Sequence, residues 1–192
     1  MANADNAFGL KPVRHITGAA YNGAADVYST ASGDNVAIYV GDPVKLSGTS
    51  STVNGVVYAD VDQAATGDVI VGVVVGVLPD TADSLIYRAA STTRRLLVAT
   101  DPHLLYEIQE VSGGTALTAA AIGLNADIVV GSGSTITGRS GVELNNATEA
   151  TTNTLDVQIV GLQARADNEV GEHAKWLVRI NRHQFANQIA GV

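Results

Sequence analysis

From residue 35 onward, apolar and polar residues alternate in short runs that predict β-strands. The two clearest runs, over 155–159 and 175–181, place every second, apolar side chain on one face. This period of two is typical of a strand with one face on a core and the other facing water. Further runs of this kind lie over 36–40, 94–99, 104–109, 126–130 and 136–144. We therefore predict about eight to ten short strands separated by turns.

The run 69–78 differs from the others, because it is apolar or glycine on both faces. Such a run predicts a central strand buried on both sides. Gly72 and Gly76 lie four residues apart on one face of it, which indicates a bend or the close approach of another backbone. The Ser/Thr/Gly/Asn-rich stretch 47–55 and the polar stretch 145–154 are interpreted as loops.

One segment favours a helix. Residues 115–122 are rich in alanine, Thr115 is a suitable N-cap, and Gly123 suits the end of the helix. No alternation of strands and helices is present, so a parallel sheet is not expected. The predicted fold is all-β, an antiparallel β-sandwich or jelly-roll-like barrel with one short helix.

Residues 1–34 have no regular apolar pattern and are interpreted as an extended N-terminal arm before a single β domain over 35–192. The arm carries spaced aromatic and cationic side chains, namely Phe8, Lys11, Arg14, Tyr21 and Tyr28. We predict that these five make contacts to a partner or a neighbouring subunit, since buried aromatic anchors dominate binding energy. The alternative is an arm that packs on its own β body.

Charge limits the classes of partner. The 192 residues include 11 Lys and Arg against 19 Asp and Glu, which gives a net charge of -8, and only 16% of residues are charged. An acidic chain is unsuited to the phosphate backbone of nucleic acid or to an anionic membrane surface. The longest apolar run has about half the ~20 residues of a membrane helix, and the polar start shows no signal peptide. The low charge fits either a Thr/Ser-rich β surface or surface buried in an assembly.

No catalytic or metal motif has the required spacing, and the chain has no cysteine. Asp60 and Asp62 begin like a calcium loop, but the third ligand and central glycine are missing, so a solvated turn is preferred. The stretch 169–173 resembles a zinc motif only superficially, because Glu169 stands where the first histidine must be. We therefore predict no enzyme activity, no cofactor and no metal, although a Ser/His/Asp triad from distant segments stays open.

Charges are unevenly distributed along the sequence. Between Leu46 and Tyr87 there are five aspartates and no basic residue, whereas Arg88, Arg94 and Arg95 follow directly and further basic residues lie over 165–182. Local ion pairing within one β domain is the preferred interpretation. The alternative is two poles of opposite sign that orient the protein on a partner.

Three segments carry a resemblance to a known class of proteins. They are the N-terminal ANADNAFGLKPVRH (2–15), the interior GLNAD (123–127) and the near-C-terminal DNEVGEHAKW (167–176). Together they cover a small part of the chain, but their order runs from end to end. They resemble segments of tailed-bacteriophage head proteins, and the chain is similar to the cement or decoration proteins that accompany an HK97-type major capsid protein.

The resemblance implies a fold, a partner and a location. Cement proteins have jelly-roll or β-tulip folds and sit on the outside of the shell as dimers or trimers at local symmetry axes. We therefore expect a virion protein on the outer surface of the capsid that binds the major capsid protein and itself. The alternative is a carbohydrate- or host-surface-binding β module, for which the single Trp176, on the apolar side of its run, is unfavourable.

Overall fold

The structure is a computed structural model that describes residues 3–191, so that Met1, Ala2 and Val192 lie outside the described residues. Its regular elements are strands, apart from one short 3₁₀ helix, η1. In chain order they are β1 (Lys11–His15), β2 (Asp26–Ser29), β3 (Pro43–Val53), β4 (Val56–Gln63), β5 (Gly72–Val77), β6 (Arg95–Ala99), β7 (Leu104–Gln109), η1 (Ala119–Ala121), β8 (Asn125–Ala126), β9 (Ile128–Val129), β10 (Glu143–Leu144), β11 (Val157–Leu162) and β12 (Lys175–Ile180). The predicted all-β fold with antiparallel sheets is confirmed.

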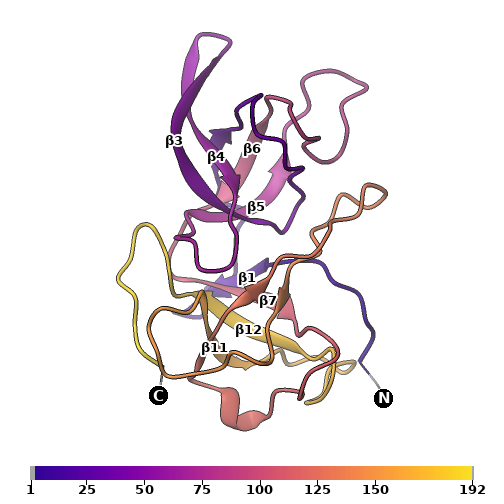
Figure 1. Ribbon diagram of the computed structural model, residues 1–192, viewed down its shortest axis with the longest axis vertical. Coiled ribbons are helices and arrows are strands. Elements are labelled where there is room, and N and C mark those ends of the chain that lie inside the picture. The colour runs from indigo at the N-terminus through magenta and orange to yellow at the C-terminus, as the bar shows by residue number, and fades with distance from the viewer. Residues whose placement is uncertain (1–2, 192) are drawn as a thin grey trace.

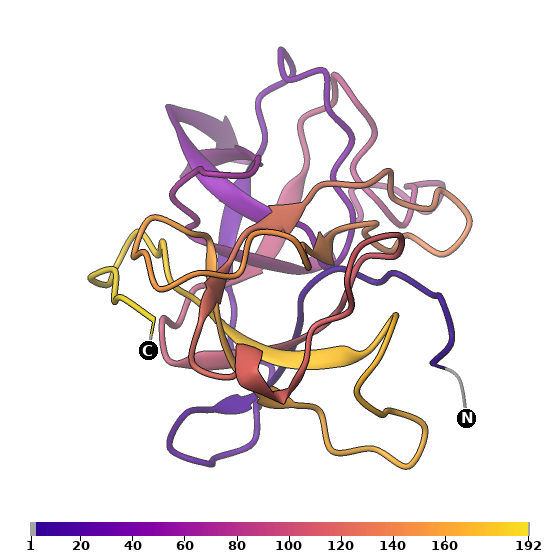
Figure 2. The same ribbon diagram turned by 60° about the horizontal axis from the view of Figure 1, so that its bottom comes forward.

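The strands form two bodies that lie end to end along the long axis of the molecule (Figure 1). One is a closed barrel with the order β2-β4-β3-β5-β6, and the other is a five-stranded sheet with the order β1-β7-β12-β11-β8. A small sheet of β9 and β10 completes the strand pairing. Figure 2 brings the sheet end of the molecule forward, with η1 in front.

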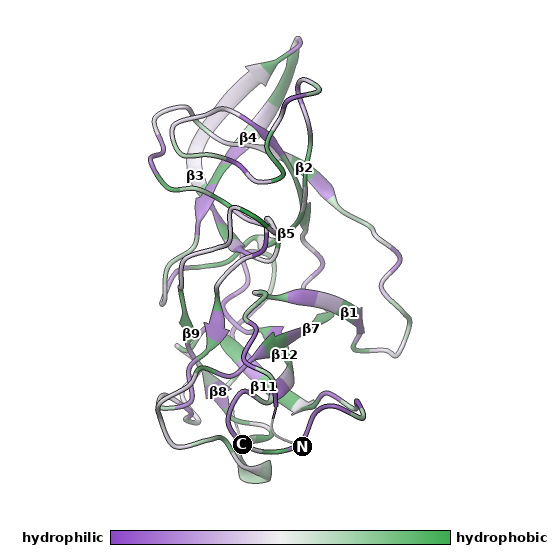
Figure 3. Ribbon diagram, turned by 90° about the vertical axis from the view of Figure 1, so that its right-hand side faces the viewer, coloured by the Kyte–Doolittle hydropathy of each residue, from purple (hydrophilic) through white to green (hydrophobic). Residues whose placement is uncertain are grey.

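A continuous core joins the two bodies. Trp176, Tyr106 and Ile108 of the five-stranded sheet pack in one cluster with Ile70 and other barrel residues. A second, smaller cluster fills the barrel and contains Ile38, Val44, Val61, Val71, Val74, Leu96 and Val98. The side view in Figure 3 places both ends of the described chain at the sheet end, away from the barrel, and Figure 1 shows them on opposite sides of that end.

Several strand predictions are confirmed. Residues 70–74 are fully or almost fully buried, and β5 contributes Val73 to the larger cluster and Val74 to the barrel cluster. The strand over 69–78 is therefore central and packed on both faces, as its sequence predicted. The alternation over 104–109 and 175–181 corresponds to β7 and β12, which pair antiparallel with Trp176 opposite Ile108.

The segment predicted as an arm is built into both bodies. Strand β1 pairs antiparallel with β7 at the edge of the five-stranded sheet, where Pro12 is tolerated because an edge strand needs fewer ladder bonds. Strand β2 pairs with β6 and with β4 and so closes the barrel. Residues 3–34 thus pack on the protein's own β body, which was the alternative interpretation of this segment. Strands of four and five residues are too short to give a clear alternation.

Several local predictions are wrong. The stretch 47–55 forms the second part of β3 and the turn to β4 rather than a loop, and the turn places Asn54 and Gly55 at positive φ. The run 36–40 is no strand, since its pairing is limited to single bridges from Ile38 to Arg88 and from Val40 to Arg139. The helix is reduced to η1, and the cap is Thr118, whose hydroxyl accepts a hydrogen bond from the Ala120 amide, in place of Thr115.

Gly72 is required by the close approach of two strands. A Cβ at this position would lie 2.3 Å from the carbonyl oxygen of Ala99 in β6, whereas a Cβ at Gly76 would meet only the side chain of Leu97, at 3.3 Å. We expect Gly72→Ala to lower the free energy of unfolding by about 1–3 kcal/mol, because backbone atoms of a paired strand cannot move aside. Gly76→Ala is the matched control and should change stability by less than about 0.5 kcal/mol. Urea unfolding compares the two, and equal effects would contradict the prediction.

Candidate functional site

The N-terminal segment meets the near-C-terminal motif at the sheet end of the molecule. The side-chain amide of Asn3 donates hydrogen bonds to the carbonyl oxygens of Glu169 and Glu172, each at 2.9 Å. The backbone amide of Glu169 in turn donates to the Asn3 Oδ1 atom at 3.1 Å. The N-terminal and near-C-terminal motifs, far apart in sequence, therefore form one continuous surface.

Gln109 is the centre of this junction. It is fully buried at the end of β7, and its Nε2 donates to Asp5 Oδ1 at 3.0 Å and to Glu143 Oε1 at 3.1 Å. Its Oε1 accepts the backbone amide of Asn6 at 2.9 Å. The side chain thereby connects the N-terminal segment to β10 and, through a 3.5 Å contact with His173 Nδ1, to the loop before β12. We call Asp5, Gln109, Glu143 and His173 the terminal latch.

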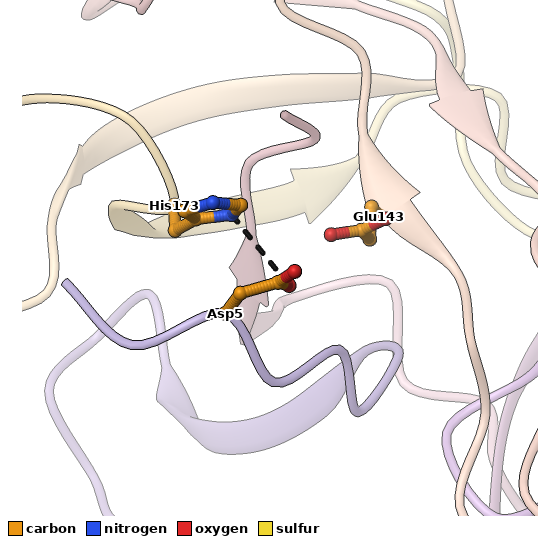
Figure 4. A group of neighbouring side chains, drawn as sticks. All are labelled: Asp5, Glu143 and His173. Carbon is orange, nitrogen blue, oxygen red and sulfur yellow. Dashed lines mark ion pairs between the residues drawn. The ribbon is translucent and has the colours of Figure 1, made fainter. Parts of the chain in front are cut away.

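Figure 4 shows the three ionisable side chains of the terminal latch, Asp5, Glu143 and His173. Asp5 Oδ1 lies 3.6 Å from His173 Nδ1, and Glu143 stands on the other side of Asp5. Burial raises the pKa of Glu143, and the nearby charge of Asp5 raises it further, whereas Gln109 and His173 act in the opposite direction. The net effect is a raised pKa for the Glu143 carboxyl, with burial as the largest cause.

Asp5, Glu143 and His173 also form the group among residues 3–191 that could hold a metal ion, since their ligand atoms lie within 4.8 Å of one another. In the arrangement observed, however, the Gln109 amide donates N–H groups to the two carboxylates. The Asn6 amide fixes this orientation by bonding Gln109 Oε1. These N–H donors occupy one oxygen of each carboxylate, so the group acts here as a hydrogen-bonded latch.

A cavity of about 540 Å³ lies beside the latch, where the N-terminal segment crosses between the sheet and the barrel. Three of the five predicted contact residues, Phe8, Lys11 and Tyr21, line it. The Tyr21 hydroxyl donates to the carbonyl oxygen of Ala24, and its ring packs on the larger core cluster. We call this the seam cavity; its apolar walls include Leu10 and Val75.

The other two predicted contact residues lie elsewhere. Arg14 is half-buried in β1, and within residues 3–191 its side chain has no hydrogen bond or ion pair. Tyr28 lies in β2 and packs against the barrel core, and burial raises the pKa of its hydroxyl. The structure therefore separates the five residues into a cavity group and two isolated positions.

Glu107 is the carboxylate of the seam cavity. It is 2% exposed, and its Oε1 lies 2.8 Å from Arg165 Nη1, while Lys11 Nζ lies 4.0 Å from Oε2. Arg165 also pairs with Asp167 at 2.9 Å, which lowers the pKa of that exposed carboxyl. This network ties β7 to the near-C-terminal motif.

Other charged motifs of the sequence have structural roles. Asp60 is 1% exposed within β4 and accepts the hydroxyls of Thr49 and Ser51, so the predicted solvated turn at this position is wrong. Lys45 pairs with Asp68 at 2.7 Å, and Asp80 pairs with Arg94 and Arg95. These pairs agree with the interpretation of the charge layout as local ion pairing.

Sequence reasoning did not identify Gln109, Glu143 or Lys175. All three occupy polar positions within runs that predict strands, and the sequence does not distinguish them from ordinary surface positions. His173 was considered only with its sequence neighbours, but its partners come from other segments.

Comparison with known proteins gives no match to any family model, curated protein or solved structure. In the described chain, no helix is long and apolar enough to cross a membrane.

Proposed function

We propose that this protein is a structural component of a tailed-bacteriophage head, which binds the outer surface of the capsid and cements neighbouring coat subunits. Its partners are then the major capsid protein and further copies of itself, as dimers or trimers. The observation that carries the proposal is the contact between two of the segments that resemble phage head proteins: the N-terminal motif and the near-C-terminal motif bond directly to each other through Asn3 and the terminal latch.

The interior motif supports the same proposal. Its residues Asn125 and Ala126 form β8 and pair with β11, so they belong to the same five-stranded sheet as β12. The Asn125 side chain also donates to the carbonyl oxygens of Thr152 and Ile189, at 2.9 and 2.8 Å. All three segments with the resemblance thus help to build one body, which gives them a common structural reason to occur together.

The outer surface offers several separate contact points. Val57, in the β3–β4 hairpin at the far end of the barrel, is 67% exposed, and Ile136, in the loop between β9 and β10, is 88% exposed (Figure 1). Contacts that are weak one by one become strong together when they share one rigid body, because each raises the effective concentration of the next. If such contacts exist only on the expanded shell, binding stabilises that shell by mass action.

The test measures binding and heat stability of capsids. Purified protein should bind expanded heads of the phage that encodes it and reach a saturating copy number. Bound protein should raise the temperature at which the heads release DNA. Unexpanded heads should bind less of it. A variant lacking residues 1–8 should bind less and protect less, because it loses Asn3 and Asp5 but keeps Leu10 and β1. Its circular dichroism and unfolding temperature serve as the folding control. Absence of binding by the intact protein to heads in either state would overturn the proposal.

A further inference from the structure

The seam cavity gathers positive charge in a protein that is acidic overall. Of the 11 Lys and Arg residues in the chain, four line this cavity, with a single carboxylate, Glu107, among them. Lys11 and Arg165 are paired with Glu107, as described above. The remaining two, Lys175 and Arg139, are not used by that network.

Lys175 is the unusual member of this group. It begins β12 opposite Gln109 of the terminal latch and is only 7% exposed. Within residues 3–191 its ammonium group makes no hydrogen bond or ion pair, although its charge helps to lower the pKa of Asp167. Its aliphatic stem is buried, and its ammonium group faces the open cavity. The open position beside Lys175 in the cavity is therefore suited to an anion.

Arg139 provides a second free cation. It is exposed, its side chain has no hydrogen bond or ion pair within the described chain, and it lines both the seam cavity and a neighbouring cavity of about 420 Å³. Asn6 also lines both cavities. The second cavity is lined by the hydroxyl side chains of Ser132, Ser134, Thr137 and Ser140.

The two cavities have different linings, and together they suit an extended peptide that lies across both of them. The seam cavity combines apolar walls, from Phe8, Pro12 and Val75, with the ammonium group of Lys175. In the neighbouring cavity the hydroxyls of Ser134 and Ser140 already accept backbone amides of the protein, and those of Ser132 and Thr137 can pair with the backbone of a bound chain. Arg139, on the boundary, can hold a carboxylate with two parallel N–H bonds. Pockets of this volume hold ligands of drug or short-peptide size.

We propose that the seam cavity binds an acidic peptide segment of a partner protein, with an aromatic or aliphatic side chain against Phe8 and a neighbouring carboxylate on Lys175 and Arg139. The N-terminal segment, held by the terminal latch, forms one wall of this site. The proposal concerns the cavity itself and does not require that the partner be a capsid protein. Peptide binding is measured on the isolated protein, so its failure is distinct from a failure of head binding.

The test uses the probe N-acetyl-Phe-Glu-amide, with N-acetyl-Phe-Gln-amide as the neutral match, in calorimetric or NMR titrations of the intact protein. The acidic peptide should bind more tightly, and the difference should shrink as salt is added. Lys175→Gln should weaken binding of the acidic peptide by about tenfold or more, because Lys175 is buried. Arg139→Gln, on an exposed loop, should weaken it about two- to fivefold.

The control variant Lys45→Gln removes a cation of the barrel that pairs with Asp68 outside the cavity, and it should leave peptide binding unchanged. Arg139→Gln also keeps the test decisive if Lys175→Gln fails to fold, since Arg139 lies outside the strands. Equal binding of the two peptides, or wild-type binding by Arg139→Gln, would overturn the proposal. Inorganic phosphate that binds as tightly as the acidic peptide would also overturn it, because the site would then recognise a simple anion.

Discussion

Replacing Arg88 with methionine is expected to lower the free energy of unfolding by about 3–5 kcal/mol, enough to leave a marginally stable domain unfolded. Arg88 is completely buried, and its charge is paired with Asp34 at 2.8 Å. Methionine would fill part of the volume but would remove the charge partner of Asp34, which would keep only the backbone amide of Val36 as a donor. The carbonyl oxygen of Val36 would also lose its Arg88 donor. The expected loss comes mainly from the uncompensated carboxylate, whose side chain is only 12% exposed.

The guanidinium group of Arg88 organises the segment that leads into the barrel. Its Nε donates to Thr30 Oγ1 and to the carbonyl of Thr92, its Nη2 donates to the carbonyls of Ala31 and Asp34, and its Nη1 bonds Asp34 and the carbonyl of Val36. These carbonyls belong to irregular backbone, where no strand partner satisfies them. The planar fork of arginine suits this arrangement, and the three donors of a lysine do not.

Urea unfolding at neutral pH tests the role of Arg88. Arg88→Lys keeps the charge and should still be strongly destabilised, since it cannot reach both sides of the segment. Arg14→Met is the matched control, because Arg14 is half-buried in β1 and its side chain has no hydrogen bond or ion pair within residues 3–191. The expected change for Arg14→Met is within about 0.5 kcal/mol. If Arg88→Met unfolds at the same urea concentration as the wild type, this account of residues 30–36 is wrong.

Arg88 also shows which parts of the fold the sequence could predict. The alternation over 104–109 and 175–181 predicted β7 and β12, because these strands border a core and every second side chain must be apolar. The run 36–40 alternates equally well, but its carbonyls and amides bond Arg88 and Gly138 instead of a neighbouring strand. Alternation indicates which side chains are buried and does not identify the partners of the backbone.

The stretch 47–55 shows the opposite case, in which a strand is present but the apolar alternation is missing. Strands β3 and β4 protrude beyond the barrel, so half-exposed Ser and Thr residues replace the apolar alternation, and hydroxyls of Thr49 and Ser51 bond the buried Asp60. The local signal was the Asn54–Gly55 turn, with both residues at positive φ, which is typical of a two-residue hairpin. The turn residues would therefore have indicated this strand pair better than the hydropathy, from which a loop was predicted.

The candidate site was only partly predictable. Phe8, Lys11 and Tyr21 were identified from their residue types, and they do line one cavity. Gln109 and Lys175 could not be identified, because their roles depend on contacts between distant segments, such as Asp5 and Gln109, which are 104 positions apart in the sequence. A residue that connects distant segments has no local pattern in the sequence.

The stability of the protein should fall in mild acid through His183, by about 2 kcal/mol between about pH 7.5 and pH 5 and by about 3 kcal/mol near pH 4. His183 is 3% exposed; its Nδ1 accepts the backbone amide of Phe185 at 3.0 Å, and its Nε2 is buried without a hydrogen-bond partner. Burial lowers the pKa of His183 from 6.5 to about 4; Asp101 opposes this shift and His103 adds to it. His183→Asn keeps an acceptor for Phe185 but cannot take up a proton.

The direction of this pH effect follows from the protonation of His183 in the folded and in the unfolded protein. Below about pH 6.5 the unfolded chain protonates this imidazole and the folded protein does not, so stability is complete above that pH and is lost as the pH falls toward 4. Asp42 and Asp156 act in the opposite direction, because burial raises the pKa of each from 3.8 to about 6 and the folded state then gains protons first. The wild-type profile alone therefore mixes opposing contributions, and the difference between wild type and His183→Asn isolates the histidine.

Phe185→Leu, which removes only the 5.8 Å ring contact with His183, should keep the wild-type pH profile. A pH profile for His183→Asn that runs parallel to the wild type from pH 7.5 to 5 would show that His183 is protonated in the folded protein as readily as in the unfolded chain.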